Sequence, residues 1–228
     1  MESNLDCHRL KNHVGDMNVG DMNVSNMIFY RDIAQQFSNT RYKVWPAVQA
    51  FIDSFTENTI NGDIGCGNGK NMTRPDVKFK GMDLTEEFVE ICKKKSLDVI
   101  QGNILNIPFE DLYFDNIICI AVIHHLDKKE NRIKAISELL RITKEGGKIM
   151  IYVWAFEQPE NSKRKFTSQD ELVPFKTKTE TYYRYYHLYV KDELEEEIRL
   201  CSLEYNYKYN IIKNDYEYGN WYIIIEKT

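Results

Sequence analysis

The 228-residue sequence has no apolar run of membrane-spanning length, and its N-terminus lacks the apolar core of a signal peptide. Its five cysteines form no C-x-x-C pair, and their odd number argues against a disulfide framework. No cysteine, histidine or carboxylate spacing indicates a metal site. We therefore expect free thiols, no membrane contact, no bound metal and a cytoplasmic location, with the nucleus as the alternative.

An excess of positive charge is also missing. The chain has 30 Lys and Arg residues against 35 Asp and Glu, a formal net charge of −5. A protein that binds nucleic acid through its global charge should be basic, so any such contact must use a local patch. Residues 163–191 supply one, with seven basic and three acidic side chains and a local net charge of +4.

The first 25 residues differ from the rest. The pentapeptide VGDMN occurs at 14–18 and again at 19–23, and a Gly, Asp and Asn-rich repeat buries little surface. We expect a disordered tail over residues 1–25 and one domain over residues 26–228. A chain of this length supports one sizeable core.

Strand and helix patterns alternate over much of this domain. Helices are expected from Asn26 and from Pro46, and again over residues 128–147, where Gly146 and Gly147 would end the helix, and 192–203. Short apolar segments predict strands at 59–63, 78–83, 98–102, 114–121 and 147–153. Two strands within 205–213 and 219–227 should pair antiparallel. This order predicts an α/β fold with a mainly parallel sheet covered by helices on both faces.

The stretch DIGCGNGK, Asp63 to Lys70, ends the first expected strand. Open parallel sheets bind ligands at the carboxyl ends of their strands, and glycines there let the backbone approach a ligand closely. Asp83 ends the second strand, where a carboxylate can bind both hydroxyls of a ribose. A tight turn that binds nothing is the other interpretation of these glycines.

Three nucleotide sites use such glycines. A phosphate-binding loop is excluded because Ile64 occupies the position of its first glycine and Asn71 follows Lys70. The third glycine comes one residue too early for a dinucleotide site. Because Asp63 would repel phosphates but suits an amino group, the pattern favours S-adenosylmethionine. The predicted cofactor-binding residues are Asp63, Gly65, Cys66, Gly67, Asp83, Gly102, Asn103, Ile104 and Ala121.

With these residues placed, the chain resembles the eukaryotic tRNA wobble-uridine carboxymethyl methyltransferases, including the methyltransferase domain fused to an AlkB-type oxygenase. The resemblance runs from about residue 27 to the C-terminus. It rests on IAxxFxxTRYKxWP (33–46), the glycine stretch, IAVIHH (120–125), GGKIMIYVWAFEQ (146–158), VPF (173–175), RYYHLY (184–189) and NWY (220–222). It implies a class I, Rossmann-like methyltransferase with a seven-stranded sheet, whose residues 155–190 form a substrate-facing insert.

The resemblance also implies methyl transfer from S-adenosylmethionine to the carboxylate of 5-carboxymethyluridine, or its 2-thio form, in a tRNA anticodon loop. It implies a small zinc-binding activator along the edge strand near Asp98–Gln101. Such a carboxylate is already ionised and needs positioning, for which arginine is suited. The candidate catalytic residues are Arg41, His124, His125 and Arg184. The candidate substrate contacts are Tyr42, Lys43, Trp154, Tyr185, Tyr186 and His187.

The segment YRYYHLY, residues 183–189, has two interpretations. Its rings could stack on a splayed anticodon base, as recognition of single-stranded RNA requires, or its tyrosines could pack as a strand, which we expect for Tyr183 and Tyr189. The alternatives to the tRNA methyltransferase are a methyltransferase acting on a small molecule or a protein, a non-catalytic RNA-binding subunit, and, more distantly, a nicotinamide oxidoreductase.

Overall fold

The computed structural model describes residues 22–40, 43–177 and 180–228; within the first range it describes the side chains of residues 29–31 and 33–40. In these ranges the helices are α1 Met22–Thr40, α2 Pro46–Asp53, α3 Glu86–Lys94, α4 Lys129–Ile142 and α5 Glu193–Tyr205, with a 3₁₀ turn at Ile123–His125. The strands are β1 Ile60–Ile64, β2 Lys78–Asp83, β3 Val99–Gln101, β4 Phe114–Ile120, β5 Thr143–Trp154, β6 Asp170–Lys176, β7 Thr181–His187, β8 Tyr209–Tyr216 and β9 Asn220–Lys227. None of the helices in this described part combines the length and apolar character needed to cross a membrane.

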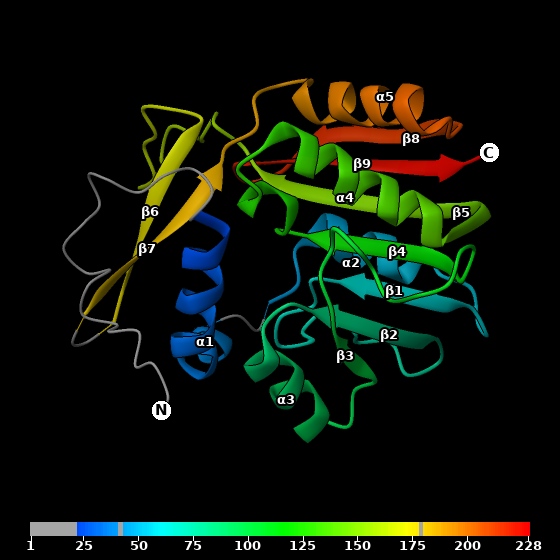
Figure 1. The fold of residues 1–228 in the computed structure, drawn as a ribbon, viewed down its shortest axis with the longest axis horizontal. Helices are drawn as coiled ribbons and strands as arrows, with labels where there is room; N and C mark the ends of the chain where they lie inside the picture. Colours follow the sequence, from blue (N-terminus) through cyan, green and yellow to red (C-terminus); the bar gives the residue numbers. More distant parts are fainter. Residues whose placement is uncertain (1–21, 41–42, 178–179) are drawn as a thin grey trace, which may run out of the picture.

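The main sheet has seven strands in the order β3-β2-β1-β4-β5-β9-β8 within the described residues (Figure 1). Strands β1 to β5 run parallel to one another. Strand β9 pairs antiparallel with β5, and β8 pairs antiparallel with β9. The predicted fold class is therefore confirmed. The third strand, β3, forms one edge of the sheet and β8 the other.

Both faces of the sheet are buried because its central strands are apolar at successive positions. Side chains of β4 alternate between faces. Ile117 and Cys119 pack with α4 and α5, whereas Ile118 and Ile120 pack with α2. The core thus lies on both sides of β4 and β5. The carboxyl ends of the parallel strands all lie at the same end of the sheet (Figure 1).

Strand β1 contains Asn61 and Gly62 at buried positions, and both residues are weak strand formers. Asn61 is tolerated because its side chain is hydrogen-bonded: Oδ1 accepts from Asn116 Nδ2 at 2.9 Å, and Nδ2 donates to Thr59 Oγ1 at 3.0 Å. A Cβ at Gly62 would lie 3.3 Å from the Phe114 ring, so a larger residue would disturb the packing of β1 on the core.

Two predicted boundaries are wrong. Helix α4 ends at Ile142 instead of at the glycines, because Thr143 already has extended backbone angles and its hydroxyl donates to Leu139 O at 2.7 Å. Gly146 and Gly147 lie inside β5. Helix α1 begins at Met22, four residues before the expected start, and the rest of the predicted tail lies outside the described residues.

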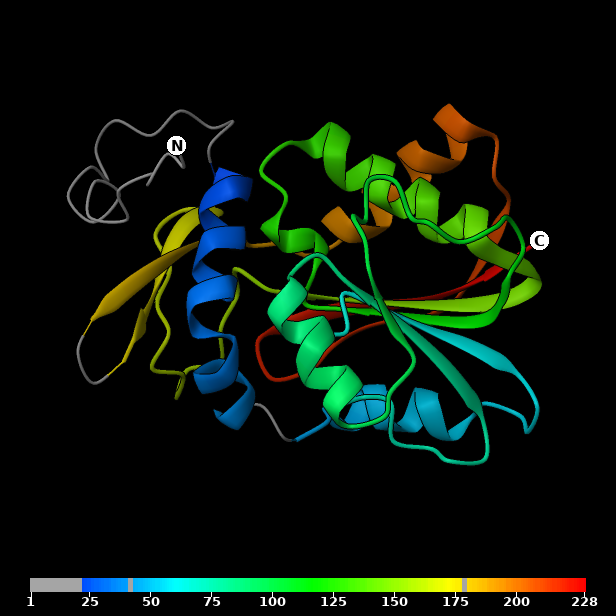
Figure 2. The ribbon, with the colours of Figure 1, turned by 60° about the horizontal axis from the view of Figure 1, so that its bottom comes forward.

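The insert over residues 155–190 contains β6 and β7, which form a separate antiparallel sheet. Helix α1 lies between this sheet and α3 (Figures 1 and 2). The contacts are aromatic: the ring centroids of Phe29 and Phe175 are 5.7 Å apart, and those of Phe37 and Phe88 are 6.0 Å apart. The insert and α1 are thereby placed over the carboxyl ends of the parallel strands.

Candidate active site

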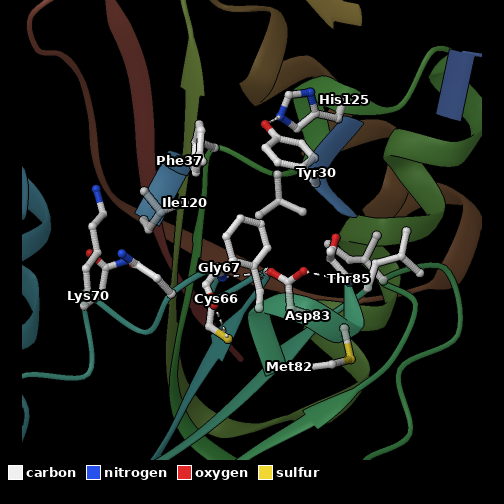
Figure 3. Close-up of a pocket in the computed structure, with 18 of the residues that line it drawn as sticks. Tyr30, Phe37, Cys66, Gly67, Lys70, Met82, Asp83, Thr85, Ile120 and His125 are labelled. Atoms are coloured by element: carbon white, nitrogen blue, oxygen red, sulfur yellow. Dashed lines mark hydrogen bonds between the residues drawn. The ribbon is translucent and has the colours of Figure 1, made fainter. Parts of the chain in front are cut away.

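A cavity of about 570 Å³ opens at the carboxyl ends of the parallel strands (Figure 3). The glycine turn after β1 forms one wall, and its backbone is fixed by hydrogen bonds from Gly65 N and Cys66 N to Met82 O, at 2.7 and 3.0 Å. Gly65 has φ +79°, and a Cβ there would lie 2.2 Å from Val122. Only glycine fits this position, and the bare backbone leaves room for a ligand.

Asp83 is held at the cavity wall by backbone donors. Its Oδ2 accepts from Gly67 N at 2.8 Å and its Oδ1 from Thr85 N at 2.9 Å (Figure 3). Burial raises the pKa of this carboxyl, and the two backbone hydrogen bonds oppose the shift. A carboxylate fixed in this way can accept hydrogen bonds from vicinal hydroxyls of a ribose.

Asp63 lies fully buried in β1, next to the glycine turn. Neither carboxylate oxygen has a hydrogen-bond partner of good geometry among the residues that the structure describes, and the nearby Asn71 side chain lowers the pKa of Asp63 only weakly. Burial raises the pKa of Asp63 to about 7, against the attraction of Lys70. An unpartnered buried carboxylate is costly, and the amino group of a methionine-like tail would supply the missing donors and charge. The residues around the cavity therefore fit S-adenosylmethionine.

The other predicted cofactor-binding residues gather at the same cavity. Its lining includes Gly65, Cys66, Gly67, Asp83, Gly102, Asn103, Ile104 and Ala121. Asp63 lies behind this lining. The side-chain oxygen of Asn103 accepts from Leu105 N at 2.9 Å and so shapes the turn after β3.

Arg184 is a buried arginine in the cavity wall. It is 3% exposed, and its guanidinium lies over four aromatic rings. The distances from Cζ to the ring centroids are 5.1 Å for Tyr186, 5.2 Å for Phe29, 5.6 Å for Phe175 and 5.9 Å for Phe37. Among the described residues no carboxylate pairs with Arg184, and its Nε has no hydrogen-bond partner.

The two neighbouring histidines have different surroundings. His125 lines the cavity: its Nδ1 lies 3.0 Å from Tyr185 O and its Nε2 3.0 Å from the Tyr30 hydroxyl (Figure 3). A carbonyl only accepts, so Nδ1 carries the proton and Nε2 accepts from Tyr30. Burial lowers the pKa of His125 to about 3, and the ring is therefore neutral.

His124 is turned away from the cavity and is fully buried. Its Nδ1 accepts from Trp154 N at 3.0 Å, and burial lowers its pKa well below the usual value. The prediction that His124 is catalytic therefore finds no support, because the side chain is used to fix the end of β5.

The YRYYHLY segment is strand β7 and its continuation. Tyr186 lines the cavity and stacks on Trp154, with centroids 4.5 Å apart. The Tyr185 hydroxyl donates to Asp170, and the buried ring is absent from the cavity lining. His187 is also outside the cavity. The prediction that Tyr185 and His187 contact substrate is therefore not supported, since alternate side chains of a strand face opposite sides.

His187 instead links the insert to α5. Its Nδ1 lies 3.0 Å from Asp170 Oδ1 and its Nε2 2.8 Å from Glu193 Oε1. Tyr189 is fully buried, as expected, but Tyr183 is 46% exposed, so its predicted packing is wrong. The segment is thus partly a packed strand and partly a cavity wall.

Arg41 and Tyr42 lie outside the described residues, and their roles stay predictions. Lys43 lines the cavity, and its contact with substrate stays a prediction. Four further lining residues were not predicted as site residues from the sequence: Tyr30, Phe37, Lys70 and Arg164. Tyr30 and Phe37 are seven residues apart on α1, a spacing that places them on one helical face and could have indicated them. Arg164 belongs to the basic patch, and its Cζ lies 3.9 Å from the Trp154 ring centroid.

Residues 62–151 match the family model described as a methyltransferase domain. The chain is 36% identical, over 87% of its length and 94% of the relative, to the tRNA (carboxymethyluridine(34)-5-O)-methyltransferase of Schizosaccharomyces pombe. It is 30% identical, over 87% of its length, to the Xenopus tropicalis tRNA (carboxymethyluridine(34)-5-O)-methyltransferase alkbh8, of which it spans 40%.

Among solved structures, a chain from the complex between the Haloferax volcanii Trm112 methyltransferase activator and a methyltransferase aligns with a TM-score of 0.64. The two chains are 14% identical, and the alignment covers 89% of this chain and 97% of that one, a likeness of fold. The match to the Schizosaccharomyces pombe relative is stronger evidence of family membership, because it combines higher identity with near-complete coverage of both chains. The chain belongs to the family of tRNA (carboxymethyluridine(34)-5-O)-methyltransferases.

Proposed function

We propose that this protein transfers the methyl group of S-adenosylmethionine to the carboxylate of 5-carboxymethyluridine, or its 2-thio form, at the wobble position of tRNA, and so forms the methyl ester. The observation that carries the proposal is Arg184, a buried cation at the cavity that no carboxylate of the described residues neutralises. A buried charge without a partner is costly, so the site favours an anionic ligand.

The cavity offers separate contacts for each part of the cofactor. Asp63 would bind the amino group, Asp83 the ribose hydroxyls, and the Asn103–Ile104 segment the adenine. When bound, S-adenosylmethionine supplies a methyl group on a positively charged sulfur. Arg184 and His125 lie in the same cavity wall and would face the acceptor.

The reaction needs no strong general base, because a carboxylate is already ionised at neutral pH. Neutral His125 therefore serves as a fixed neighbour rather than a proton acceptor. Arg184 would orient the carboxylate through its planar donors, and the four surrounding rings exclude water. Positioning of this kind can supply roughly 7–11 kcal/mol of barrier reduction at its limit.

The tRNA would approach over the insert. The patch at 163–191 gives local positive charge, and its Arg164 stacks on Trp154 at the cavity. The exposed Tyr183 ring lies on the face of β7 opposite Arg184 and is available to a base outside the cavity. Arg41 and Tyr42 remain predicted contacts beside Lys43.

We further propose that a small zinc-binding activator pairs with β3, near Asp98–Gln101. The support is that β3 is an edge strand whose outer backbone groups can accept another strand. The archaeal structural neighbour was solved in complex with a methyltransferase activator. Co-expression with such a protein should increase the yield of soluble chain, and an unchanged yield would count against the pairing.

The proposed reaction is tested with methyl-labelled S-adenosylmethionine, the co-expressed activator, and tRNA that carries 5-carboxymethyluridine. After transfer, mild base hydrolyses a methyl ester and releases volatile labelled methanol. Volatile label supports the proposal. Label that resists base would mean a methyl group on a ring atom or a ribose and would overturn the acceptor. Methyl transfer in the absence of tRNA would favour a small-molecule or protein methyltransferase. Cofactor binding without any methyl transfer would favour a non-catalytic RNA-binding subunit.

A further inference from the structure

Two cysteine thiols converge beneath the cofactor cavity. Cys66 belongs to the glycine turn and Cys92 to α3, 26 residues later. Their Sγ atoms lie 3.8 and 3.2 Å from the same acceptor, the carbonyl oxygen of Gly67. Each thiol also shifts the pKa of the other, as close neighbours do. Both are free, and both are packed in one small apolar cluster.

The surroundings hold the two sulfur atoms together. A Cβ at Gly81 would lie 3.1 Å from the Cys66 sulfur, and one at Gly69 would lie 3.1 Å from the Cys92 sulfur. The glycines therefore let the turn and α3 close tightly on the pair. Cys66 is a lining residue of the cavity and Cys92 is not, so a small solute that enters the cavity meets Cys66 before Cys92.

We propose that Cys66 and Cys92 are a redox modification site, at which a peroxide converts the two thiols to a disulfide and weakens cofactor binding. The Cys66 sulfur attacks the peroxide, the O–O bond breaks, and a sulfenic acid and one water form. The Cys92 sulfur then attacks the Cys66 sulfur, forms the S–S bond and displaces the second water. In total the two thiols lose two electrons and two protons, and one peroxide becomes two waters.

The two thiols differ in reactivity. The neighbouring Cys66 thiol, together with the charge of Lys95, lowers the pKa of Cys92 although burial opposes the shift. Both steps need a thiolate, and Cys92 is therefore suited to supply one in the second step. The neighbouring Cys92 thiol, with burial, raises the pKa of Cys66. The first step should accordingly be slower than for an exposed cysteine.

The consequence for the cofactor follows from Gly67. Its carbonyl accepts hydrogen bonds from both thiols, and a disulfide has no hydrogen to donate. Its amide donates to Asp83 Oδ2, the proposed ribose contact. Thiols are weak donors, and the loss of both hydrogen bonds, at the low end of the usual range of strengths, corresponds to roughly a tenfold loss of affinity. The inference rests on the proposed cofactor site, but not on tRNA as the acceptor.

The test uses the full chain, reduced and then treated with hydrogen peroxide, with or without saturating S-adenosylhomocysteine. Peptide mapping by mass spectrometry identifies the Cys66–Cys92 crosslink, and calorimetry gives the affinity for S-adenosylhomocysteine. We expect the crosslink, an affinity about tenfold lower, recovery with dithiothreitol, and protection by prior ligand. Cys92→Ser should form no crosslink, whereas Cys201→Ser, which removes another buried thiol, should behave as wild type.

Separate oxidation of the two sulfur atoms without a crosslink would overturn the proposal, as would a crosslink that leaves the affinity unchanged. The wild-type measurement alone decides both points if a variant fails to fold. Failure of tRNA methylation would leave the crosslink and its effect on ligand binding intact. The two proposals can therefore fail separately.

Discussion

Replacing Asp63 by asparagine should separate the stability of the protein from its affinity for cofactor. Asp63 is fully buried without a hydrogen-bond partner among the described residues, and burial raises its pKa from 3.8 to about 7. A carboxyl whose pKa is higher in the folded state binds its proton more tightly there. The free energy of unfolding therefore falls as the pH rises from the unfolded pKa to the folded pKa, and this loss is complete above about pH 7.

The magnitude follows from the shift. Each pKa unit corresponds to about 1.4 kcal/mol, and a rise from 3.8 to about 7 gives a cost of up to about 4 kcal/mol for ionised Asp63 in the cofactor-free protein. Asp63→Asn removes this cost. The variant should be more stable than wild type near pH 8, and its advantage should shrink by roughly 3 kcal/mol near pH 5. Its affinity for S-adenosylhomocysteine should fall by about 10- to 100-fold.

Urea unfolding of both proteins without ligand, near pH 5 and near pH 8, measures the difference, and calorimetry measures ligand affinity. Asp53→Asn, which removes an exposed carboxylate of α2, serves as the control. Equal stability of wild type and Asp63→Asn near pH 8 would refute the reasoning. An advantage that grows toward acidic pH would also refute it.

Three further predictions concern the cavity and the insert. Arg184→Ala should lower kcat/KM for tRNA by about 100-fold with little change in S-adenosylhomocysteine affinity; a large loss of that affinity would contradict its role. Tyr30→Phe leaves His125 Nε2 without its donor and should lower kcat/KM by roughly tenfold, whereas unchanged kinetics would exclude a positioning role. Hydrogen bonds to Glu193 and Asp170 raise the pKa of His187 against the effect of burial, so the docking of the insert on α5 should weaken above about pH 6.5. Limited proteolysis of the insert should therefore increase with pH in wild type but not in His187→Gln.

Much of the main sheet could be predicted because its strands are short apolar runs between turn signals. The cofactor turn was also readable, since its glycines and two carboxylates fall at strand ends. The end of α4 could not be predicted, because the hydroxyl of Thr143 caps the last helical turn three residues before the glycines. Asparagine is unfavourable at a buried strand position such as Asn61. The side chain that satisfies it, Asn116, is 55 residues away along the chain and could not be identified from the sequence.

The acceptor side of the cavity was harder to predict than the cofactor side. Adjacent histidines look equivalent in sequence, but a bend after β4 turns His125 to the cavity and His124 to the backbone of β5. In YRYYHLY, the pairing of β7 with β6 decides which rings face the cavity. The rings around Arg184 come from α1 and from the insert, and the partner of Tyr30 comes from the turn after β4, so only the folded chain brings them together.

We expect buried Arg184 to select a carboxylate acceptor. The most direct measurement compares methyl transfer to two tRNAs that differ only at the wobble uridine, one with the 5-carboxymethyl group and the other with the neutral 5-carbamoylmethyl group. We predict base-labile methyl label on the acid and none on the amide. Equal labelling of both tRNAs, or label that resists base on either, would contradict it.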